Sequence, residues 1–476
     1  MLPVVCLALA TVVAAVASLN VALPSIAEDT HADQSRLSWI IDAYALVFAA
    51  LLLLGGALGD RFGRRSALLA GLAIFGAGSG VAMAADGSGL LIAMRAVLGV
   101  GAALVMPATL STITSTFPPE RRAKAVSLWA GVAGASAVLG LLTSGLLLEA
   151  WSWRSVFGLN VALAVVAIVA TLLVVPESAD PDAPRLDIGG AAITVVGLGL
   201  LVYSIIEAPS EGWTAVRTLG GIAAGLVVLA VFVFWELRRA HPLLDPRLFR
   251  RPGFAAGTLS ICAQFFAFFG FVFLVLQYLQ LVRGDRPLVA AVSLIPMALG
   301  MMPASRVSPV LAAKAGARRV CVAGLVLICA TLVGLSQLGA GTSYWLISGE
   351  LIVLGIGMGL AMTPATTAVT DALPTSEQGV GSAVNDLARE LGGALGIAVL
   401  GSIFASSYHS NLDLAGVPAP VAAKAQESLA VASRLGPRIA DSARSAFIDG
   451  MSAALICGAV VVGMVAIAVA ALLRPR

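Results

Sequence analysis

The amino-acid sequence predicts an all-α integral membrane protein that crosses the bilayer about fourteen times. The chain has 476 residues, of which 59% are hydrophobic and only 12% are charged, and its mean hydropathy is +0.98. A water-soluble protein of this size carries roughly twice that charged fraction, so lipid must surround most of the chain. The 50 glycines agree with this, because small residues let helices approach closely inside a bilayer.

Apolar runs locate the spans, because about 20 apolar residues cross a hydrocarbon core about 30 Å thick. The first run begins at Met1 with no basic segment before it and no cleavage signature after it, so we interpret it as a retained span. In chain order, the expected spans are 3–24, 37–58, 66–85, 89–113, 126–148, 155–175, 187–208, 216–237, 253–281, 287–312, 320–338, 343–367, 379–406 and 447–472.

Basic residues predict the orientation of these spans. If the N-terminus is cytoplasmic, the inner loops hold most of the basic side chains, among them the pairs Arg64-Arg65, Arg121-Arg122 and Arg318-Arg319. The short outer loops hold Arg36, Arg154, Arg217, Arg283 and Arg286. The positive-inside rule therefore predicts a multi-pass protein of the cell membrane with both termini in the cytoplasm.

The spans are organised as six, two and six. We expect an N-terminal six-helix bundle in residues 1–175, a linker with two additional transmembrane helices in 176–250, and a C-terminal six-helix bundle in 251–476. A polar, Pro-containing segment at 176–187 marks the first boundary. The outer stretch 408–445 is the longest hydrophilic connection and contains Ala-rich sequence of helical character.

A basic turn follows the second span, and a related turn with a Gly and an Arg pair follows the second span of the last six (312–319). The first turn reads Gly56-Ala57-Leu58-Gly59-Asp60-Arg61-Phe62-Gly63-Arg64-Arg65. It resembles, in residue types and in position, the loop motif of the major facilitator superfamily. Five further segments resemble the fourteen-helix drug:proton antiporter branch of that family, the EmrB/Qac type. These are 20–24 (Asn-Val-Ala-Leu-Pro), 39–44, 153–157, 277–280 and 392–396.

This resemblance covers nearly the whole chain and implies the major-facilitator fold, with two six-helix bundles and two extra central helices. It implies a proton-coupled multidrug efflux transporter, an antiporter that exports hydrophobic, cationic compounds by alternating access and gives antibiotic resistance. The partners implied are such small molecules, protons and the lipid bilayer. We expect a monomer with no enzymatic activity, no cofactor, no metal and no nucleic acid.

Two departures from the branch keep a second reading open. Ala15 stands where its members carry an Asp, and the fifth span reads Gly140-Leu141-Leu142-Thr143-Ser144-Gly145 where they carry a Gly-Pro pair. The alternative is an exporter or uniporter of a specific endogenous metabolite, antibiotic or lipid without strict proton antiport. A membrane-embedded enzyme would need a nucleophile, a metal cluster or an acid/base set, and none stands out. A sensor on the same scaffold would carry an added soluble domain.

Ionisable residues inside spans are costly in hydrocarbon and usually face a cavity or a partner. Asp42 and Arg95 lie at similar depths below the outer ends of the second and fourth spans, so they can pair. We interpret Asp42 as a site for a proton or a cation, with Arg95 modulating its proton affinity. A static ion pair that fixes helix packing is the alternative. By resemblance, Asp42 matches an acidic position tied to cationic-drug export, and Arg95 with Gly99 and Gly101 matches the fourth-helix motif tied to proton coupling.

The thirteenth span offers a second acidic group. Asp386 and Glu390 are four residues apart and share a helical face, and Arg389 can neutralise either of them. A solvated helix end is an equally good reading of this group. Glu350, alone in the twelfth span, is a candidate of lower rank.

The turn after the second span has two readings. Asp60, Arg61, Arg64 and Arg65 can lock helix ends by charge-assisted hydrogen bonds and so act as a gate. Topogenic positive charge alone explains the arginines but neither Asp60 nor the glycines. Aromatic residues can line a cavity for a flat cation, although most such residues in spans pack or face lipid; these residues are Trp39, Tyr44, Phe265, Phe266, Phe268, Phe269 and Tyr278.

Overall fold

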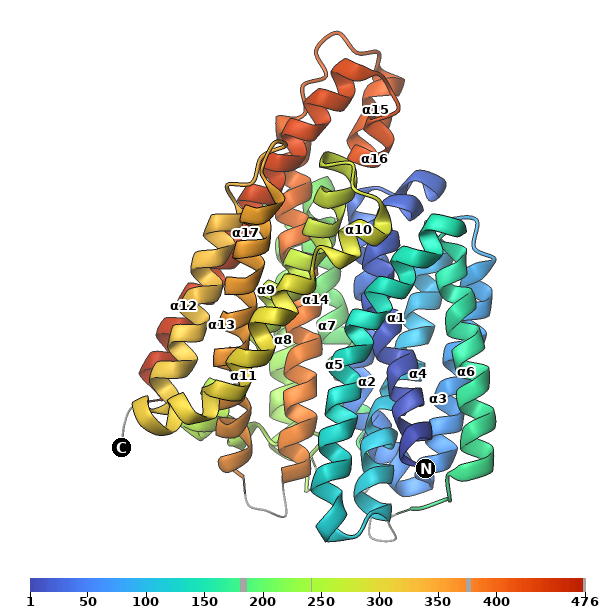
Figure 1. The fold of residues 1–476 in the computed structure, drawn as a ribbon, viewed down its shortest axis with the longest axis vertical. Helices are drawn as coiled ribbons and strands as arrows, with labels where there is room; N and C mark the ends of the chain where they lie inside the picture. Colours follow the sequence, from blue (N-terminus) through green and yellow to red (C-terminus); the bar gives the residue numbers. More distant parts are fainter. Residues whose placement is uncertain (180–185, 241, 374–377, 474–476) are drawn as a thin grey trace.

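The structure is a computed structural model that describes residues 1–179, 186–240, 242–373 and 378–473. Within these residues, 14 helices are long and apolar enough to cross a membrane, which confirms the predicted all-α membrane fold. Figure 1 shows the long helices standing side by side, with the N-terminus and the end of the last helix at one end of the molecule. The segment of residues 412–446 forms a small helical hairpin at the opposite end. We call these two ends the terminal side and the hairpin side.

The helices fall into three groups along the chain. The first, which we call the N-terminal half, consists of α1 (Leu2–Thr30), α2 (Gln34–Phe62), α3 (Arg64–Met83), α4 (Ser88–Thr116), α5 (Pro119–Ala150) and α6 (Arg154–Val174). The central pair is α7 (Ile188–Glu211) and α8 (Val216–Glu236). The C-terminal half consists of the 3-10 helix η1 (Pro246–Arg250), α9 (Pro252–Gln277), the π-helix η2 (Tyr278–Val282), α10 (Pro287–Val292), α11 (Ile295–Ala315), α12 (Ala317–Leu335), α13 (Tyr344–Asp371), α14 (Gln378–Asn411), α15 (Ala419–Glu427), α16 (Leu429–Ala432) and α17 (Pro437–Leu472). The exact domain boundaries at residues 175 and 250 stay a prediction.

Two predicted spans differ in detail from the structure. The span expected at 287–312 is divided into α10 and α11, and a proline, Pro296, stands in the first turn of α11, where its missing N–H is tolerated. The last span was expected to begin at residue 447, but α17 already begins at Pro437. Its polar first turns belong to the hairpin outside the apolar stretch, so a hydropathy window cannot detect them. The helical character predicted within 408–445 is confirmed by α15 and α16.

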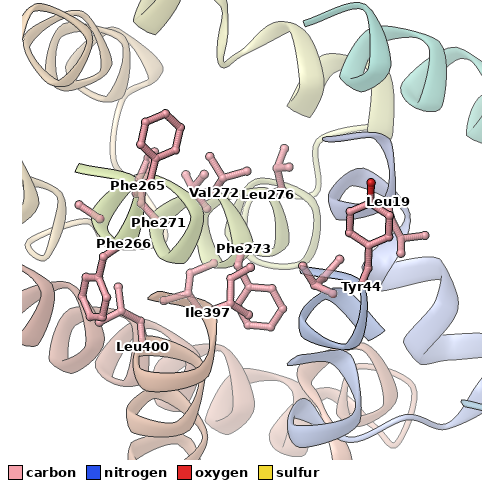
Figure 2. Close-up of a cluster of buried hydrophobic side chains, with 14 of the residues drawn as sticks. Leu19, Tyr44, Phe265, Phe266, Phe271, Val272, Phe273, Leu276, Ile397 and Leu400 are labelled. Carbon is pink, nitrogen blue, oxygen red and sulfur yellow. The ribbon is translucent and has the colours of Figure 1, made fainter. Parts of the chain in front are cut away.

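Glycines allow the central helices to pack backbone against backbone. A methyl group built on Gly55 of α2 would lie 2.0 Å from the Ala103 carbonyl oxygen of α4, and one on Gly396 of α14 would lie 2.2 Å from the Phe266 carbonyl oxygen of α9. Helices in lipid associate through such close packing because no hydrophobic force draws them together. Figure 2 shows the buried cluster that results, in which side chains of α9 and α14 lie together with Leu19 of α1 and Tyr44 of α2.

The central helix α7 fills the seam between α2 and α14. The Ser35 hydroxyl of α2 donates to the Ile206 carbonyl oxygen (3.2 Å), and the Ser402 hydroxyl of α14 donates to the Ile205 carbonyl oxygen (2.6 Å). Apolar side chains of the three helices form a separate buried cluster that includes Leu46 of α2, Val202 of α7 and Ala398 of α14. The insertion of two helices therefore places one of them against both halves.

The two halves join directly on the hairpin side. The Gln280 amide donates to the Val21 carbonyl oxygen (3.0 Å), and Arg434 of the hairpin is 2.5 Å from Glu28 at the end of α1. His31 lies 3.9 Å from Glu427. Among the described residues, every direct hydrogen bond or ion pair between α1–α6 and α9–α17 lies at this end. The described state is thus held closed on the hairpin side.

Candidate functional site

Asp42 is a fully buried carboxylate in the second span. It is 0% exposed, and neither of its carboxylate oxygens has a hydrogen-bond partner among the described residues. An ionised carboxylate held without partners away from water is costly. Binding of a proton or of a cation would remove that cost.

The helical turns on either side of Asp42 show which neighbour it faces. One turn earlier, the Ser38 hydroxyl lies 2.7 Å from a methyl group built on Gly401 of α14. One turn later, Leu46 belongs to the buried cluster that contains Ala398 of α14. Because residues four apart lie on the same helical face, Asp42 faces α14, which belongs to the other half. It therefore lies where the two halves meet.

Arg95 of α4 faces a different side of α2. Its Nε donates to the Ile40 carbonyl oxygen (2.8 Å), and its guanidinium carbon lies 4.4 Å from the ring centre of Tyr44. Arg95 is 1% exposed, and its Nη2 has no hydrogen-bond partner among the described residues. The guanidinium is thus held by a carbonyl and an aromatic face, and its Nη2 group makes no hydrogen bond within the described residues.

The predicted Asp42–Arg95 pair is therefore wrong. Both carboxylate oxygens of Asp42 and the Nη2 of Arg95 lack a hydrogen-bond partner among the described residues, although Ile40 and Tyr44 confirm that Arg95 reaches the depth of Asp42. The cause is the helical turn of about 100° per residue, which places Tyr44 on the α4 side and Asp42 on the α14 side. Gly99 of α4 packs against this side of α2, since a methyl group there would lie 2.7 Å from the Tyr44 carbonyl oxygen.

The acidic group of α14 is an ion pair with an additional carboxylate. Arg389 lies 3.7 Å from Asp386, and the two side chains are 33% and 15% exposed. The guanidinium of Arg389 also lies 4.7 Å from the ring centre of Phe265 on α9. Of the two predicted choices, Arg389 therefore neutralises Asp386, and Glu390 has no ion-pair partner within the described chain. Because both charged side chains are largely covered, the group is more than a freely solvated helix end.

Glu350 and two of the aromatic candidates contact neighbouring helices. A methyl group on Gly334 of α12 would lie 2.5 Å from the Glu350 carboxylate, so this side chain faces α12. The Trp39 indole donates to Glu207 of α7 (3.0 Å), and the Tyr278 hydroxyl donates to the Gly339 carbonyl oxygen (2.7 Å). Packing against neighbouring helices accounts for these three residues. Phe265, Phe268 and Phe269 pack together on α9 beside the Arg389 group, with Phe268 edge-on to the other two rings.

The turn between α2 and α3 is a compact, charged corner. Arg64 donates from Nε to the Asp60 carboxylate at 2.8 Å, one helical turn away. Gly63 has φ 118°, a backbone conformation that strongly favours glycine, and its N–H donates to the Gly59 carbonyl oxygen. The guanidinium of Arg61 lies 5.8 Å from the Phe62 ring centre. The motif residues thus close one helix and begin the next within a single turn.

Glu177, just beyond α6, binds the first residues of α3 at this corner. The sequence analysis did not predict this contact. Its carboxylate accepts hydrogen bonds from the backbone amides of Arg65 (3.0 Å) and Ser66 (3.1 Å) and from the Ser66 hydroxyl. Burial opposes its ionisation, but these bonds and the Ser178 amide outweigh burial and hold the pKa of Glu177 below its usual range. The carboxylate takes the place of an N-cap for α3. The one available signal was that Glu177 and the turn were predicted on the same side of the membrane.

The two glycines of the fifth-helix motif are contact points. A methyl group on Gly140 would lie 2.4 Å from the Ala14 carbonyl oxygen of α1, and one on Gly145 would lie 2.7 Å from Leu288 Cα of α10. The first contact joins helices within the N-terminal half. The second joins α5 to the C-terminal half on the hairpin side.

A bundle of two halves and a central pair of helices, with acidic side chains where the halves meet, is typical of a membrane transporter. The family profile of the Major Facilitator Superfamily matches residues 5–397. The chain belongs to this family.

Relatives and solved structures agree with that assignment. The chain is 32% identical over 475 residues to the tetracenomycin C resistance and export protein of Streptomyces glaucescens, covering 95% of this chain and 87% of the relative. It is 34% identical to the multidrug efflux pump LfrA of Mycolicibacterium smegmatis, over 93% of this chain and 90% of the pump. Its fold is similar to that of a bacterial homologue of the human lysosomal transporter Spinster, with a TM-score of 0.67, 15% identity and coverage of 99% and 96% of the two chains.

Proposed function

We propose that this protein is a multidrug exporter that exchanges protons for hydrophobic, cationic compounds. The observation that carries the proposal is Asp42, a fully buried carboxylate without a partner among the described residues, on the face of α2 that meets the other half. The names of the multidrug efflux pump and the antibiotic exporter to which the chain is similar support drug export as the activity.

The mechanism follows from competition for Asp42. A proton and a cationic compound each neutralise the carboxylate, so only one of them is needed at a time. If protons bind when the site faces outside and the compound binds when it faces inside, each ligand favours a different arrangement of the halves, and exchange results. The Asp386–Arg389–Glu390 group of α14 is the second acidic site of this scheme.

The described state fits one half of this cycle. The direct bonds between the halves lie on the hairpin side, and the positive-inside rule assigns the opposite, terminal side to the cytoplasm. We therefore propose a plasma-membrane protein with both termini inside, captured closed to the outside. The Asp60–Arg64 corner, which lies on the cytoplasmic side in this orientation, would then act as the gate that changes partners in the other state.

The test is transport by everted membrane vesicles that carry a pH-sensitive dye. Adding a monovalent cationic substrate such as ethidium should release protons from vesicles with the wild-type protein, and Asp42→Asn should abolish this release. Asp42→Glu, which keeps the charge, is the matched control and should retain part of it. Proton release that is unchanged in Asp42→Asn would overturn the proposal.

A second candidate is an exporter of one compound without strict proton antiport. Ala15 and the absence of proline from Gly140–Gly145 favour it, and so does the name of the tetracenomycin C exporter. Proteoliposomes with and without an imposed pH gradient separate the two candidates. Export that is equally fast in both would support the second.

A further inference from the structure

The N-terminal half contains a pocket apart from the meeting of the halves. It has a volume of about 210 Å³ and lies between α1, α5 and α6. Figure 1 shows α1 between the ribbons of α5 and α6, and α1 packs against both of these helices. Leu139, on the pocket wall, is 56% exposed on the surface of the bundle, which in a membrane protein is the side that meets lipid. The pocket therefore opens toward the bilayer.

Two polar side chains lie on the wall of this pocket. Ser144 of α5 is 0% exposed, and its hydroxyl has no hydrogen-bond partner among the described residues. Asn160 of α6 is 5% exposed and lines the same pocket, where its amide offers both donors and an acceptor. By contrast, Ser18, Ser136 and Thr143 on the same walls donate to backbone carbonyls of their own helices.

These two side chains lie at the same depth. Ser144 is six residues before the end of α5 at Ala150, and Asn160 is six residues after the start of α6 at Arg154. At 1.5 Å per residue, both are about 9 Å inside the helix ends on the hairpin side. A lipid acyl chain has no polar group that would satisfy them at this depth. An unsatisfied polar group in hydrocarbon is costly, so a ligand with its own hydrogen-bonding group is favoured.

We propose that this α1–α5–α6 pocket is a second binding site, which takes a neutral, flat molecule of about two fused rings from the bilayer. All its lining side chains are uncharged and most are apolar, including Leu7, Leu147 and Leu163, so a cation gains nothing there. An engineered cavity of about 150 Å³ binds benzene, and this pocket is larger. A carbonyl or hydroxyl group on the ligand accepts hydrogen bonds from Ser144 and Asn160. The site is independent of the proton exchange proposed for Asp42.

Two matched probes test the proposal on the purified full chain in phosphatidylcholine nanodiscs. Tritiated 2-acetylnaphthalene carries a carbonyl, and 2-isopropylnaphthalene has nearly the same shape without it. Binding is measured by scintillation proximity with empty nanodiscs subtracted and no pH gradient. We expect the acetyl compound to bind about fivefold more tightly for each hydrogen bond it makes.

Three variants locate the binding. Ser144→Ala with Asn160→Leu should abolish the preference for the acetyl compound, and Ala10→Leu, which fills the pocket, should weaken both probes. Ser136→Ala is the matched control, because its hydroxyl is already bound to the Val132 carbonyl oxygen, and should keep the preference. Equal affinity of the two probes for the wild-type protein would overturn the proposal, because it would show that the pocket does not recognise the carbonyl group. That comparison needs no variant, so it decides the matter even if a variant fails to fold.

Discussion

The guanidinium of Arg95 rests 4.4 Å from the ring centre of Tyr44, while Asp42, two residues earlier in the same helix, faces the opposite half. The buried arginine of α4 thus contacts a ring and a carbonyl, and the nearby carboxylate of Asp42 has no hydrogen-bond partner among the described residues. Under the proposed function, this carboxylate is the one that binds a mobile ligand. The separation of these two roles around a single turn of α2 underlies the first two predictions.

The Tyr44 ring should stabilise the fold through its contact with Arg95. Tyr44→Leu removes the ring and should lower the free energy of unfolding by about 2 kcal/mol, the strength of a desolvated cation–π contact. Tyr44→Phe keeps the ring, and the hydroxyl it removes has no partner among the described residues, so it should cost under about 1 kcal/mol. Unfolding in mixed detergent micelles measures both. Equal losses in the two variants would contradict the role of the ring.

Asp42 and Arg95 should behave as independent sites. A double-mutant cycle with Asp42→Asn and Arg95→Gln should give a coupling free energy below about 0.5 kcal/mol, because the two groups share no contact. Breaking one side of a buried ion pair would instead cost about 3–5 kcal/mol. Unfolding of the four proteins measures the coupling. A coupling free energy near the larger figure would instead show that Asp42 and Arg95 form an ion pair.

Gly145 should control how tightly the halves close on the hairpin side. In Gly145→Ala the new methyl group would lie 2.7 Å from Leu288 Cα, so the closed arrangement should become less populated. Gly134→Ala in the same helix is the control, since no described residue lies within 4 Å of its added carbon. Spin-label distances between α5 and α10 measure the populations. Identical distance distributions for the two variants would show that the contact is unimportant.

Glu177 should protect the start of α3 in a pH-dependent way. Because hydrogen bonds lower the pKa of Glu177 in the folded state, its contribution is present above the unfolded pKa of about 4.3 and is lost as the pH falls through the lower folded value. Glu177→Gln should therefore speed hydrogen exchange at the Arg65 and Ser66 amides at pH 7. The difference from wild type should disappear in strong acid. Exchange that is the same at pH 7 would contradict this account.

Glu350 should be dispensable for proton exchange, unlike Asp42. Its carboxylate faces Gly334 of α12 and not the other half. Glu350→Gln should therefore keep cationic-dye efflux within about twofold of wild type, a change in barrier below about 0.4 kcal/mol. Efflux is measured in the same everted vesicles as for Asp42→Asn. Loss of efflux in both variants would return Glu350 to the site.

Sequence reasoning predicts the spans well because each one must satisfy the same requirement for apolar length. It also predicts depth, as Arg95 shows by contacting Ile40 and Tyr44 on either side of Asp42. It does not predict which neighbour a side chain faces, since that depends on how the helices are rotated and packed. The Asp42–Arg95 pair failed for this reason, and the direction of Glu350 became visible only in the structure.

Contacts between distant segments were equally hidden. Glu177 and Ser66 lie far apart in the sequence, and no spacing rule connects a carboxylate after α6 with the amides of α3. The charged corner itself was recognisable, because Asp60 and Arg64 are only four residues apart and Gly59 and Gly63 lie in the same short segment. Local motifs can thus be recognised in the sequence, whereas the contacts that distant residues make with them become visible only in the structure.

The position of α7 has a consequence for the route by which compounds travel. Ser35 of α2 and Ser402 of α14 donate hydrogen bonds to the adjacent carbonyls of Ile206 and Ile205. In the proposed alternating-access cycle, α7 would therefore lose its contact with one half when the two halves separate. A compound dissolved in the lipid beside this seam is separated from the two halves by α7. Under the proposed function, such a compound would have to reach Asp42 from another side of the molecule.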